Sequence, residues 1–316
     1  MSGTDASALP LVTVVIPCYN ATATLENTIR SVRAQTYPNI EIVAVNDGSK
    51  DGTLALLHAL QGPDLRVLDQ PNGGAAAARN TAIAVARGDI LAFVDADDYW
   101  HPDKVARQVA VFQANPAIVL VGCRAEVEAL SGGRQKVNPT REPPRGPRAW
   151  VTLLHHSFYV PSVVAARTDV VRRIGGFTAR MRAGEDDQDF AIRMALQGEV
   201  GFVDADLVTM HQQAGSLSIV HLSREHLTVL PMILGHCSAV ADRLRPGELR
   251  WILGARYTQI GRNVYLGAPG QGFRLLLKAI LKGNEPLANM RYLLTAAPWT
   301  RRLKAWLRPS AYKSNP

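Results

Sequence analysis

Short apolar runs rich in β-branched residues recur along the first hundred residues of the chain, and segments with helical spacing separate them. The run at 90–94 does not alternate between apolar and polar positions, which is typical of a strand buried on both faces. Strands that alternate with helices predict a parallel sheet with helices on both faces, and hence an α/β fold. The predicted strands cover residues 11–16, 40–45, 65–68 and 90–94, and the predicted helices cover 22–35, 54–60 and 75–87. We expect Thr22 or Thr24 to cap the first of these helices.

Three carboxylates follow the run at 90–94 within four positions: Asp95, Asp97 and Asp98. In open α/β sheets, ligands bind outside the carboxyl ends of the strands, where these acids are expected. A divalent cation would relieve their mutual repulsion, because hard cations take oxygen ligands and bridge carboxylates to phosphate. From these residues alone, a solvated acidic turn that caps the next helix through Asp98 or Asp103 is the alternative.

A glycine pair, Gly73-Gly74, leads into the predicted helix at 75–87, and this helix carries Arg79 one turn inside. Backbone N–H groups at a helix N-terminus bind phosphate, and an arginine adds a charged fork to the same anion. The segment is neither a GxGxxG motif nor a Walker loop, so a tight turn into a stable helix is the alternative explanation.

Seven motifs follow one another along the chain: Val14–Asn20, Val45–Ser49, Asn72–Asn80, Phe93–Asp98, Pro161–Val163, Ile174–Phe177 and Glu185–Arg193. In this order they resemble the family 2 glycosyltransferases, which are inverting, metal-dependent enzymes of GT-A fold. The resemblance covers residues 11 to about 220 and implies a Rossmann-like, mostly parallel central sheet with helices on both faces. We expect a flexible N-terminus (1–10), a GT-A domain (11–220) with a nucleotide-binding half (11–100) and an acceptor half (101–220), and a basic helical C-terminal region (221–316).

The resemblance implies a nucleotide-sugar donor, with a UDP-sugar favoured, and Mn²⁺ or Mg²⁺ held by Asp97 with Asp95 nearby. Asp47 would read the edge of the nucleobase, although Asn46 stands where the family often has a second acid. An aspartate that accepts from a base N–H suits uracil, thymine or guanine, so the base stays open. The donor-binding residues implied by the resemblance are Pro17, Tyr19, Asn20, Asp47, Gly74, Arg79, Asp95 and Ala96. His211 would contact metal or phosphate, because many members carry histidine where Gln213 stands here; a purely structural histidine is the alternative.

The general base is expected in the cluster Glu185-Asp186-Asp187-Gln188-Asp189. If a metal handles the leaving group, one carboxylate suffices for a single inverting displacement. The family pattern registered on Arg193 assigns the base to Asp187, whereas the literal Glu-Asp pair assigns it to Asp186. We favour Asp187. Acids also stabilise a helix N-terminus, which is the alternative role for some members of the cluster.

Residues 131–148 hold four prolines, three glycines and five basic residues against one acid. Such a composition predicts a mobile loop with no core to bury. This loop would either fold over an anionic acceptor or remain an ordinary surface loop.

Charge is distributed unevenly along the chain. Residues 241–316 carry 14 Lys and Arg against three acids, a net charge of +11, whereas residues 1–240 carry 21 basic and 24 acidic residues. A basic C-terminal region suggests an anionic surface as partner, and Trp299 and Trp306 among cations suit a lipid interface. A solvated basic face, or docking onto the catalytic domain or a second subunit, is the alternative.

Cys18, Cys123 and Cys237 are odd in number and lack metal-ligand spacing, which suits a reducing compartment. No run of about 18 apolar residues occurs, so we expect no spanning helix. The N-terminus lacks the features of a signal peptide. The expected location is cytoplasmic, with peripheral contact at the inner membrane face left open.

Three functions compete on these residues: a glycosyltransferase, a metal-dependent sugar-phosphate nucleotidyltransferase and a non-catalytic nucleotide-sugar-binding module. A nucleotidyltransferase is expected to have a glycine-rich segment with a basic residue near the first strand, and Pro17-Cys18-Tyr19-Asn20 has neither. A binding module is expected to have lost the metal acids or the base, whereas Asp95, Asp97 and Asp187 are present. Processive family members carry Gln-x-x-Arg-Trp, but Gly247 precedes Arg250-Trp251 here, so single addition is expected. The expected acceptor is a glycan or glycolipid of the cell surface, with no nucleic-acid partner; an oligomer is left open.

Overall fold

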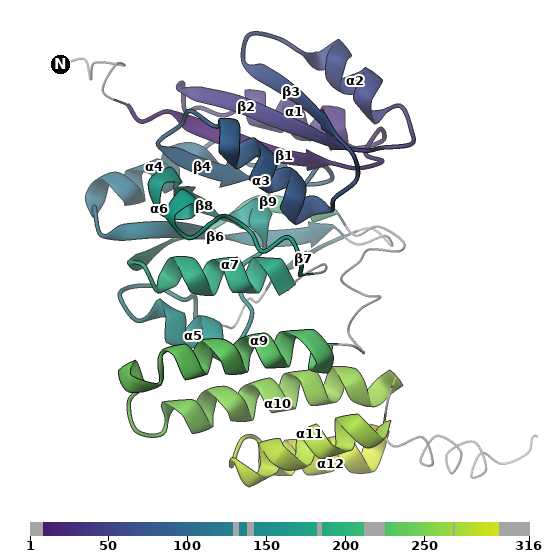
Figure 1. Ribbon diagram of the computed structural model, residues 1–316, viewed down its shortest axis with the longest axis vertical. Helices are drawn as coiled ribbons and strands as arrows, with labels where there is room; N and C mark the ends of the chain where they lie inside the picture. The colour runs from purple at the N-terminus through teal and green to yellow at the C-terminus, as the bar shows by residue number, and fades with distance from the viewer. Residues whose placement is uncertain are drawn as a thin grey trace, which may run out of the picture. The chain divides into compact units, whose positions relative to one another are not determined.

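The computed structural model describes residues 9–128, 133–137, 142–181, 185–211, 225–267 and 269–296. The chain divides into two compact units (Figure 1). One comprises residues 1–153 with 157–218 and holds the sheet, and the other comprises residues 154–156 with 219–316 and is helical in its described part. The predicted α/β class with a helical C-terminal region is confirmed.

The sheet of the first unit has the strand order β3-β2-β1-β4-β8-β6-β9-β5, and β7 pairs with β6. Strands β1 to β4 pair in parallel, as the alternation of strands and helices predicts, with β1 between β2 and β4. Beyond β4, antiparallel pairs of β8 with β4 and β6 make the sheet mixed. The strands are β1 (Val12–Cys18), β2 (Ile40–Asp47), β3 (Leu65–Gln70), β4 (Ile90–Phe93), β5 (Tyr99–Trp100), β6 (Ile118–Glu128), β7 (Arg134–Lys136), β8 (Ala165–Arg167) and β9 (Glu199–His211).

Helices pack on this sheet through apolar stripes, as in α1, where Leu25, Ile29 and Val32 recur at helical spacing and are buried. Helix α3 packs on β1 and β2, α4 on β6 and β9, and α7 on β6. The helices of the first unit are α1 (Leu25–Arg33), α2 (Thr53–Leu60), α3 (Ala75–Val85), α4 (Lys104–Ala114), α6 (Thr168–Arg173) and α7 (Glu185–Ala195), with the short 3₁₀ helix η2 (Pro161–Val163). Helix α5 (Ala149–His155) carries the chain from the first unit into the second.

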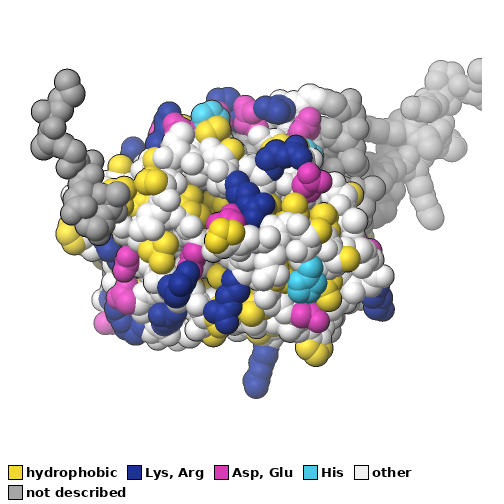
Figure 2. All heavy atoms as spheres, turned by 90° about the horizontal axis from the view of Figure 1, so that it is seen from above, with side chains coloured by type: hydrophobic (Ala, Val, Ile, Leu, Met, Phe, Trp, Pro, Cys, Tyr) yellow, Lys and Arg dark blue, Asp and Glu magenta, His cyan; other side chains and the backbone are white. Residues whose placement is uncertain are grey.

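The face of the molecule seen from above shows basic and acidic side chains interspersed with apolar ones (Figure 2). No large area of a single charge is visible among the described side chains on this face. This agrees with the nearly balanced charge of residues 1–240.

Two local expectations were wrong. The stretch 131–148 is not wholly a loop, because residues 134–136 form β7, which pairs antiparallel with residues 126–128 of β6. Polar strand residues need no core of their own when they extend an existing sheet; residues 129–132 and 138–141 lie outside the described part. Thr24 precedes α1 but makes no capping hydrogen bond with its side chain. Thr22, the other expected cap, instead donates its hydroxyl to Asp51 (2.6 Å).

The second unit contains α9 (Glu225–Ala239), α10 (Glu248–Gly267), α11 (Pro269–Leu281) and α12 (Pro286–Ala296). Residues 297–316, including Trp299 and Trp306, lie outside the described part of the chain. None of the described helices is both long enough and apolar enough to cross a bilayer.

Gly122 in β6 provides a test of core packing. A Cβ built at this position would lie 2.2 Å from Cε1 of Tyr159, a side chain that is itself buried. We expect Gly122→Ala to lower the free energy of unfolding by at least about 2 kcal/mol, because overpacking a well-packed core forces side chains to shift. Thermal and denaturant unfolding measure this change.

Gly235→Ala is the matched control. Gly235 lies in α9, and a Cβ there would meet no atom within 4 Å. Alanine favours a helix interior over glycine by about 0.8–1.0 kcal/mol, so this variant should be as stable as the parent or more so. Equal destabilisation by both substitutions would contradict the packing described for β6.

Candidate active site

The loop that follows β4, residues 95–98 (the acid loop), lies at the carboxyl end of the parallel strands. A turn closes it, with the N–H of Asp98 donating to the carbonyl of Asp95 (3.0 Å). The hydroxyl of Thr28 in α1 donates to the carbonyl of Ala96 (3.0 Å). The three carboxylates differ in exposure, because Asp95 and Asp97 are half-buried whereas Asp98 is buried.

Asp97 carries a charge that no described side chain neutralises. Burial, together with the neighbouring Asp95, raises the pKa of Asp97 to about 6. Among the residues that the structure describes, no three His, Cys, Asp or Glu side chains are grouped to hold a metal by themselves. Two carboxylates fit a cation of the Mg²⁺ type, which takes one or two protein carboxylates and completes its shell with substrate phosphate and water. The acid loop therefore suits a cation shared with a substrate.

Arg79 of α3 joins the acid loop to the beginning of α7. Its guanidinium lies 2.7 Å from Asp95, 3.2 Å from Asp186 and 3.5 Å from Asp187. The side chain is 5% exposed. Burial alone would lower the pKa of Arg79, but the three carboxylates outweigh it and raise the pKa. Arg79 was expected to contact phosphate; the structure surrounds it with acids, and the phosphate contact stays a prediction.

The acids of the cluster at 185–189 begin α7, which the favourable charge at a helix N-terminus explains for the first turn. Asp189 and Arg193 pair at 2.7 Å within the helix, and Arg193 also donates to the carbonyl of Ile174. The arginine used to register the motif therefore anchors α7 to the preceding turn.

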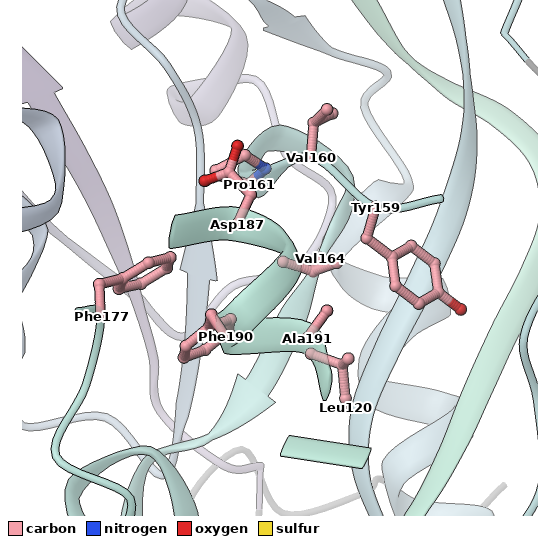
Figure 3. Close-up of a pocket in the computed structure, with 9 residues that line it drawn as sticks. All are labelled: Leu120, Tyr159, Val160, Pro161, Val164, Phe177, Asp187, Phe190 and Ala191. Carbon is pink, nitrogen blue, oxygen red and sulfur yellow. The ribbon is translucent and has the colours of Figure 1, made fainter. Parts of the chain in front are cut away.

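Asp187 lies at the edge of a small apolar pocket. The pocket is lined by aromatic and aliphatic side chains, among them Phe177 and Phe190, and Figure 3 shows Asp187 on one side with these rings on the other. Burial and the adjacent Asp186 raise the pKa of Asp187 well above its usual value, although Arg79 opposes the shift. Asp187 is thus a more basic carboxylate than an exposed aspartate.

Asp47 holds the glycine turn in place. Its carboxylate accepts from the N–H groups of Gly73 and Gly74, both at 2.8 Å, and from the side-chain amide of Gln70 (2.7 Å). Gly74 has φ +87°, a conformation that favours glycine. The N–H groups expected to face phosphate thus point at Asp47. Each carboxylate oxygen can accept more than one donor, so a further contact between Asp47 and a base N–H stays a prediction.

Asn20 ties the turn after β1 to the turn after β2. It adopts φ 49°, its carboxamide oxygen accepts from the N–H of Lys50 (2.8 Å), and its own N–H donates to the hydroxyl of Ser49 (3.0 Å). Tyr19, next to it, is exposed, and Pro17 lies within β1. The donor-side residues expected at these two turns are therefore neighbours in the structure.

His211 ends β9 beside the acid loop. Its ring contacts the hydroxyl of Tyr99 and lies 3.1 Å from a carboxylate oxygen of Glu128. Burial lowers the pKa of His211. The ring is thus held by β5 and β6, and its expected contact with metal stays a prediction. Gln213 lies outside the described residues.

Sequence reasoning missed two residues at the candidate site. Ser162 in η2 lies within hydrogen-bonding distance of both Asp95 and Asp98, and the hydroxyl of Tyr99 contacts the ring of His211. The motif Pro161–Val163 marked the first of these positions but gave no role for its serine. No pattern in the sequence indicated the second.

One family profile and several known proteins match parts of the chain. The profile of the family described as Glycosyl transferase family 2 matches residues 13–175. The uncharacterized glycosyltransferase EpsJ of Bacillus subtilis is 40% identical over 117 residues, which cover 36% of this chain and 34% of EpsJ. TuaG of the same organism, a putative teichuronic acid biosynthesis glycosyltransferase, is 43% identical over 103 residues, covering 32% of this chain and 41% of TuaG. The matches thus span well under half the length of these relatives.

Two solved structures resemble the fold over most of the chain. The mannosyltransferase PcManGT from Pyrobaculum calidifontis, in complex with GDP-Man and Mn²⁺, has a TM-score of 0.61 at 22% identity, covering 95% of this chain and 85% of its own. S. aureus TarS 1-349 in complex with UDP has a TM-score of 0.55 at 18% identity, covering 86% of this chain and 88% of its own. At such identities the likeness concerns the fold.

The ion pairs of Arg79 give a stability prediction. We expect Arg79→Met to lower the free energy of unfolding at pH 7 by about 3 kcal/mol or more, because buried carboxylates lose their counter-charge. The pKa of Asp187, already raised by burial, then lies further above its unfolded value, so the folded variant binds more protons and the deficit should shrink between pH 7 and pH 5. Denaturant unfolding at both pH values measures it.

Arg30→Met serves as the control. Arg30 pairs with Glu26 on the exposed face of α1, with 68% and 56% of the two side chains exposed. Exposed pairs of this kind contribute about 0.3–0.5 kcal/mol. A loss for Arg79→Met no larger than that for Arg30→Met would show that the buried network does not stabilise the fold.

Proposed function

The chain belongs to glycosyl transferase family 2, and on that premise we propose that it transfers a sugar, with inversion, from a nucleotide-diphosphate sugar to an acceptor hydroxyl. The observation that carries the proposal is the position of Arg79, which brings the acid loop and the beginning of α7 into one site. Acids for a metal-bound donor and a carboxylate for an acceptor thereby lie side by side.

On the donor side, we assign the cation site to Asp97 and Asp95, with Mn²⁺ or Mg²⁺ as the ion and His211 as a further candidate ligand. When bound, the cation would neutralise the negative charge of the departing diphosphate. Arg79 keeps the carboxylate of Asp95 in position at 2.7 Å. The half-buried Asp97, with its raised pKa, supports this assignment.

The remaining donor contacts are proposed at the carboxyl ends of β1 and β2 and in the turns after β1 and β3: Pro17, Tyr19, Asn20, Asp47 and Gly74, with Ala96 in the acid loop. The hydrogen bonds of Asn20 and Asp47 connect these turns and support a common donor site. A UDP-sugar is favoured. The related structures carry UDP in one case and GDP-Man in the other, so the screen described below includes both bases.

On the acceptor side, Asp187 is proposed as the general base. A carboxylate with a raised pKa accepts a proton from an acceptor hydroxyl more readily than an ordinary aspartate, and it lies in the site where the acids converge. Asp186 is the second candidate, but its side chain is 6% exposed against 17% for Asp187. Access to an acceptor therefore favours Asp187. Single addition to a cell-surface glycan or glycolipid is the proposed outcome.

The C-terminal region is proposed to contact an anionic membrane surface. Phe273, Leu277 and Leu281 recur every four residues on α11 and are 48%, 43% and 72% exposed. Arg274 and Lys278 are exposed on the adjoining side of the helix, and α11 and α12 contain no acidic residue. An apolar stripe beside cations suits an interfacial helix on anionic lipid.

The donor screen tests the function. We expect hydrolysis or transfer of a UDP-sugar that requires Mn²⁺ or Mg²⁺ and that exceeds turnover of GDP- and dTDP-sugars. Asp97→Asn should abolish metal-dependent donor turnover, because the substitution removes the negative ligand. Asp103→Asn, an acid at the beginning of α4, is the control and should retain turnover. Full turnover by the wild type in chelator would overturn the metal assignment.

The assignment of the base predicts a separation of binding from chemistry. Asp187→Asn should bind nucleotide as the wild type does, because the donor contacts remain, while transfer falls by about 100-fold or more. Isothermal titration with the nucleotide diphosphate and single-turnover transfer measure the two properties. Retained transfer in this variant, with loss in Asp186→Asn, would move the base to Asp186.

The membrane contact predicts salt-sensitive co-sedimentation with anionic vesicles and weak binding to neutral ones. Leu277→Glu on α11 and deletion of residues 298–316 should each reduce binding. Leu227→Glu, at an exposed position of α9, is the control and should bind as the wild type does. Binding unchanged by Leu277→Glu, or equal on neutral vesicles, would refute the contact.

A further inference from the structure

The third carboxylate of the acid loop has surroundings unlike those of the other two. Asp98 is 5% exposed, and both of its oxygens accept hydrogen bonds from the protein. One accepts from the hydroxyl of Ser162 in η2, and the other accepts from the backbone N–H of His211 at the end of β9 (3.3 Å). The carboxylate of Asp98 is therefore buried and engaged by protein donors, unlike the half-buried carboxylates of Asp95 and Asp97.

Ser162 holds the acid loop at two points. Its hydroxyl oxygen accepts from the N–H of Asp95 (3.1 Å), while the hydroxyl proton is donated to Asp98. The carbonyl of Ser162 accepts from the indole N–H of Trp100 (3.0 Å), just beyond the loop. The serine is fully buried. One residue of η2 thus fixes the first residue, the last residue and the exit of the acid loop.

A buried polar cluster keeps η2 itself in place. The side-chain amide of Gln108 in α4 donates to the carbonyls of Val163 (3.0 Å) and Val121 (3.1 Å). The ammonium group of Lys104 donates to Gln108 (2.8 Å) and lies 3.9 Å from the centre of the Trp100 ring. These buried contacts connect η2 to α4 and β6, so η2 is held by groups that are themselves packed, in addition to its contacts with the acid loop.

We propose that Asp98 is a positioning residue and not a metal ligand: with Ser162 it forms a latch that fastens the acid loop to η2 and to the end of β9. The inference deepens the proposed function and rests on it, since what the latch positions is the pair Asp95 and Asp97. Burying an aspartate beside two other acids costs free energy. The hydroxyl of Ser162 and the N–H of His211 are both buried donors, and an uncharged residue of the same size would not satisfy both of them as well. Even a small displacement of a catalytic group lowers the rate of reaction strongly, so the position of Asp95 and Asp97 matters for turnover.

The alternative for Asp98 is direct metal ligation, and a double-mutant cycle separates the two. The variants are Ser162→Ala, Asp98→Ala and the double variant, each assayed for metal-dependent donor turnover across a Mn²⁺ titration. The latch predicts that each single variant lowers kcat by about 10-fold or more and that the double variant is no worse than the more impaired single one. A metal ligand predicts that Ser162→Ala leaves the Mn²⁺ dependence of the wild type while Asp98→Ala shifts it.

A conservative substitution and a buried control sharpen the cycle. Asp98→Asn keeps an oxygen for the N–H of His211, so the latch predicts a higher kcat for this variant than for Asp98→Ala. If Asp98 were a metal ligand, the two variants would be equally impaired. Thr168→Ala removes a buried hydroxyl that donates to the carbonyl of Gly88 (2.6 Å), away from the acid loop. This control should lower the melting temperature as Ser162→Ala does but leave kcat unchanged.

Hydrogen exchange tests the latch without reference to turnover. The amides of Asp95 and His211 should exchange faster in Ser162→Ala and Asp98→Ala than in Thr168→Ala. A wild type without nucleotide-sugar turnover would refute the proposed function, and the exchange rates would still decide the latch. Additive losses in kcat in the double variant, or unchanged exchange of the Asp95 amide in Ser162→Ala, would overturn the latch.

Discussion

The site depends on the buried guanidinium of Arg79. Arg79 lies among Asp95, Asp186 and Asp187, which come from a loop 16 residues away and a helix more than 100 residues away. Without the guanidinium, these carboxylates would repel one another in a poorly solvated region, where charge interactions are strong. Arg79 therefore allows the acid loop and the beginning of α7 to approach, and that approach creates the site.

The acids near Arg79 are distinguished by their environments and not by their residue type. Asp95 is paired with Arg79, Asp97 has a raised pKa and no described counter-charge, and Asp98 is satisfied by buried donors. Asp187 is made more basic by an apolar pocket and by Asp186. Neighbouring carboxylates with different surroundings can perform different chemical tasks, which is how the proposed site divides cation binding, positioning and proton acceptance.

Much of this arrangement followed from local sequence. The unbroken apolar run before Asp95 predicted a central buried strand, and β4 is that strand, paired with β1 on one side and β8 on the other. A helix N-terminus was the alternative role for the acids at 185–189, and α7 begins at Glu185. The strand is indicated by an apolar run and the helix start by acidic residues, and a short stretch of sequence contains both signals.

What the sequence could not supply are contacts between distant segments. Ser162 meets Asp98 across 64 residues, and the carboxylate of Asp47 is taken up by the N–H groups of the turn at Gly73-Gly74. Nothing in the neighbourhood of a serine or an aspartate specifies such a partner. The strand at 134–136 was missed for the same reason, because its pairing with β6, and not its own composition, makes it a strand.

The decisive experiment is a crystal structure with the nucleotide diphosphate and Mn²⁺. We predict one site, with Mn²⁺ on Asp97 and the diphosphate, Asp187 open to the same space, and Arg79 linking Asp95 to Asp186. A nucleotide bound away from the acid loop, or a metal ion that Asp97 does not coordinate, would contradict this prediction.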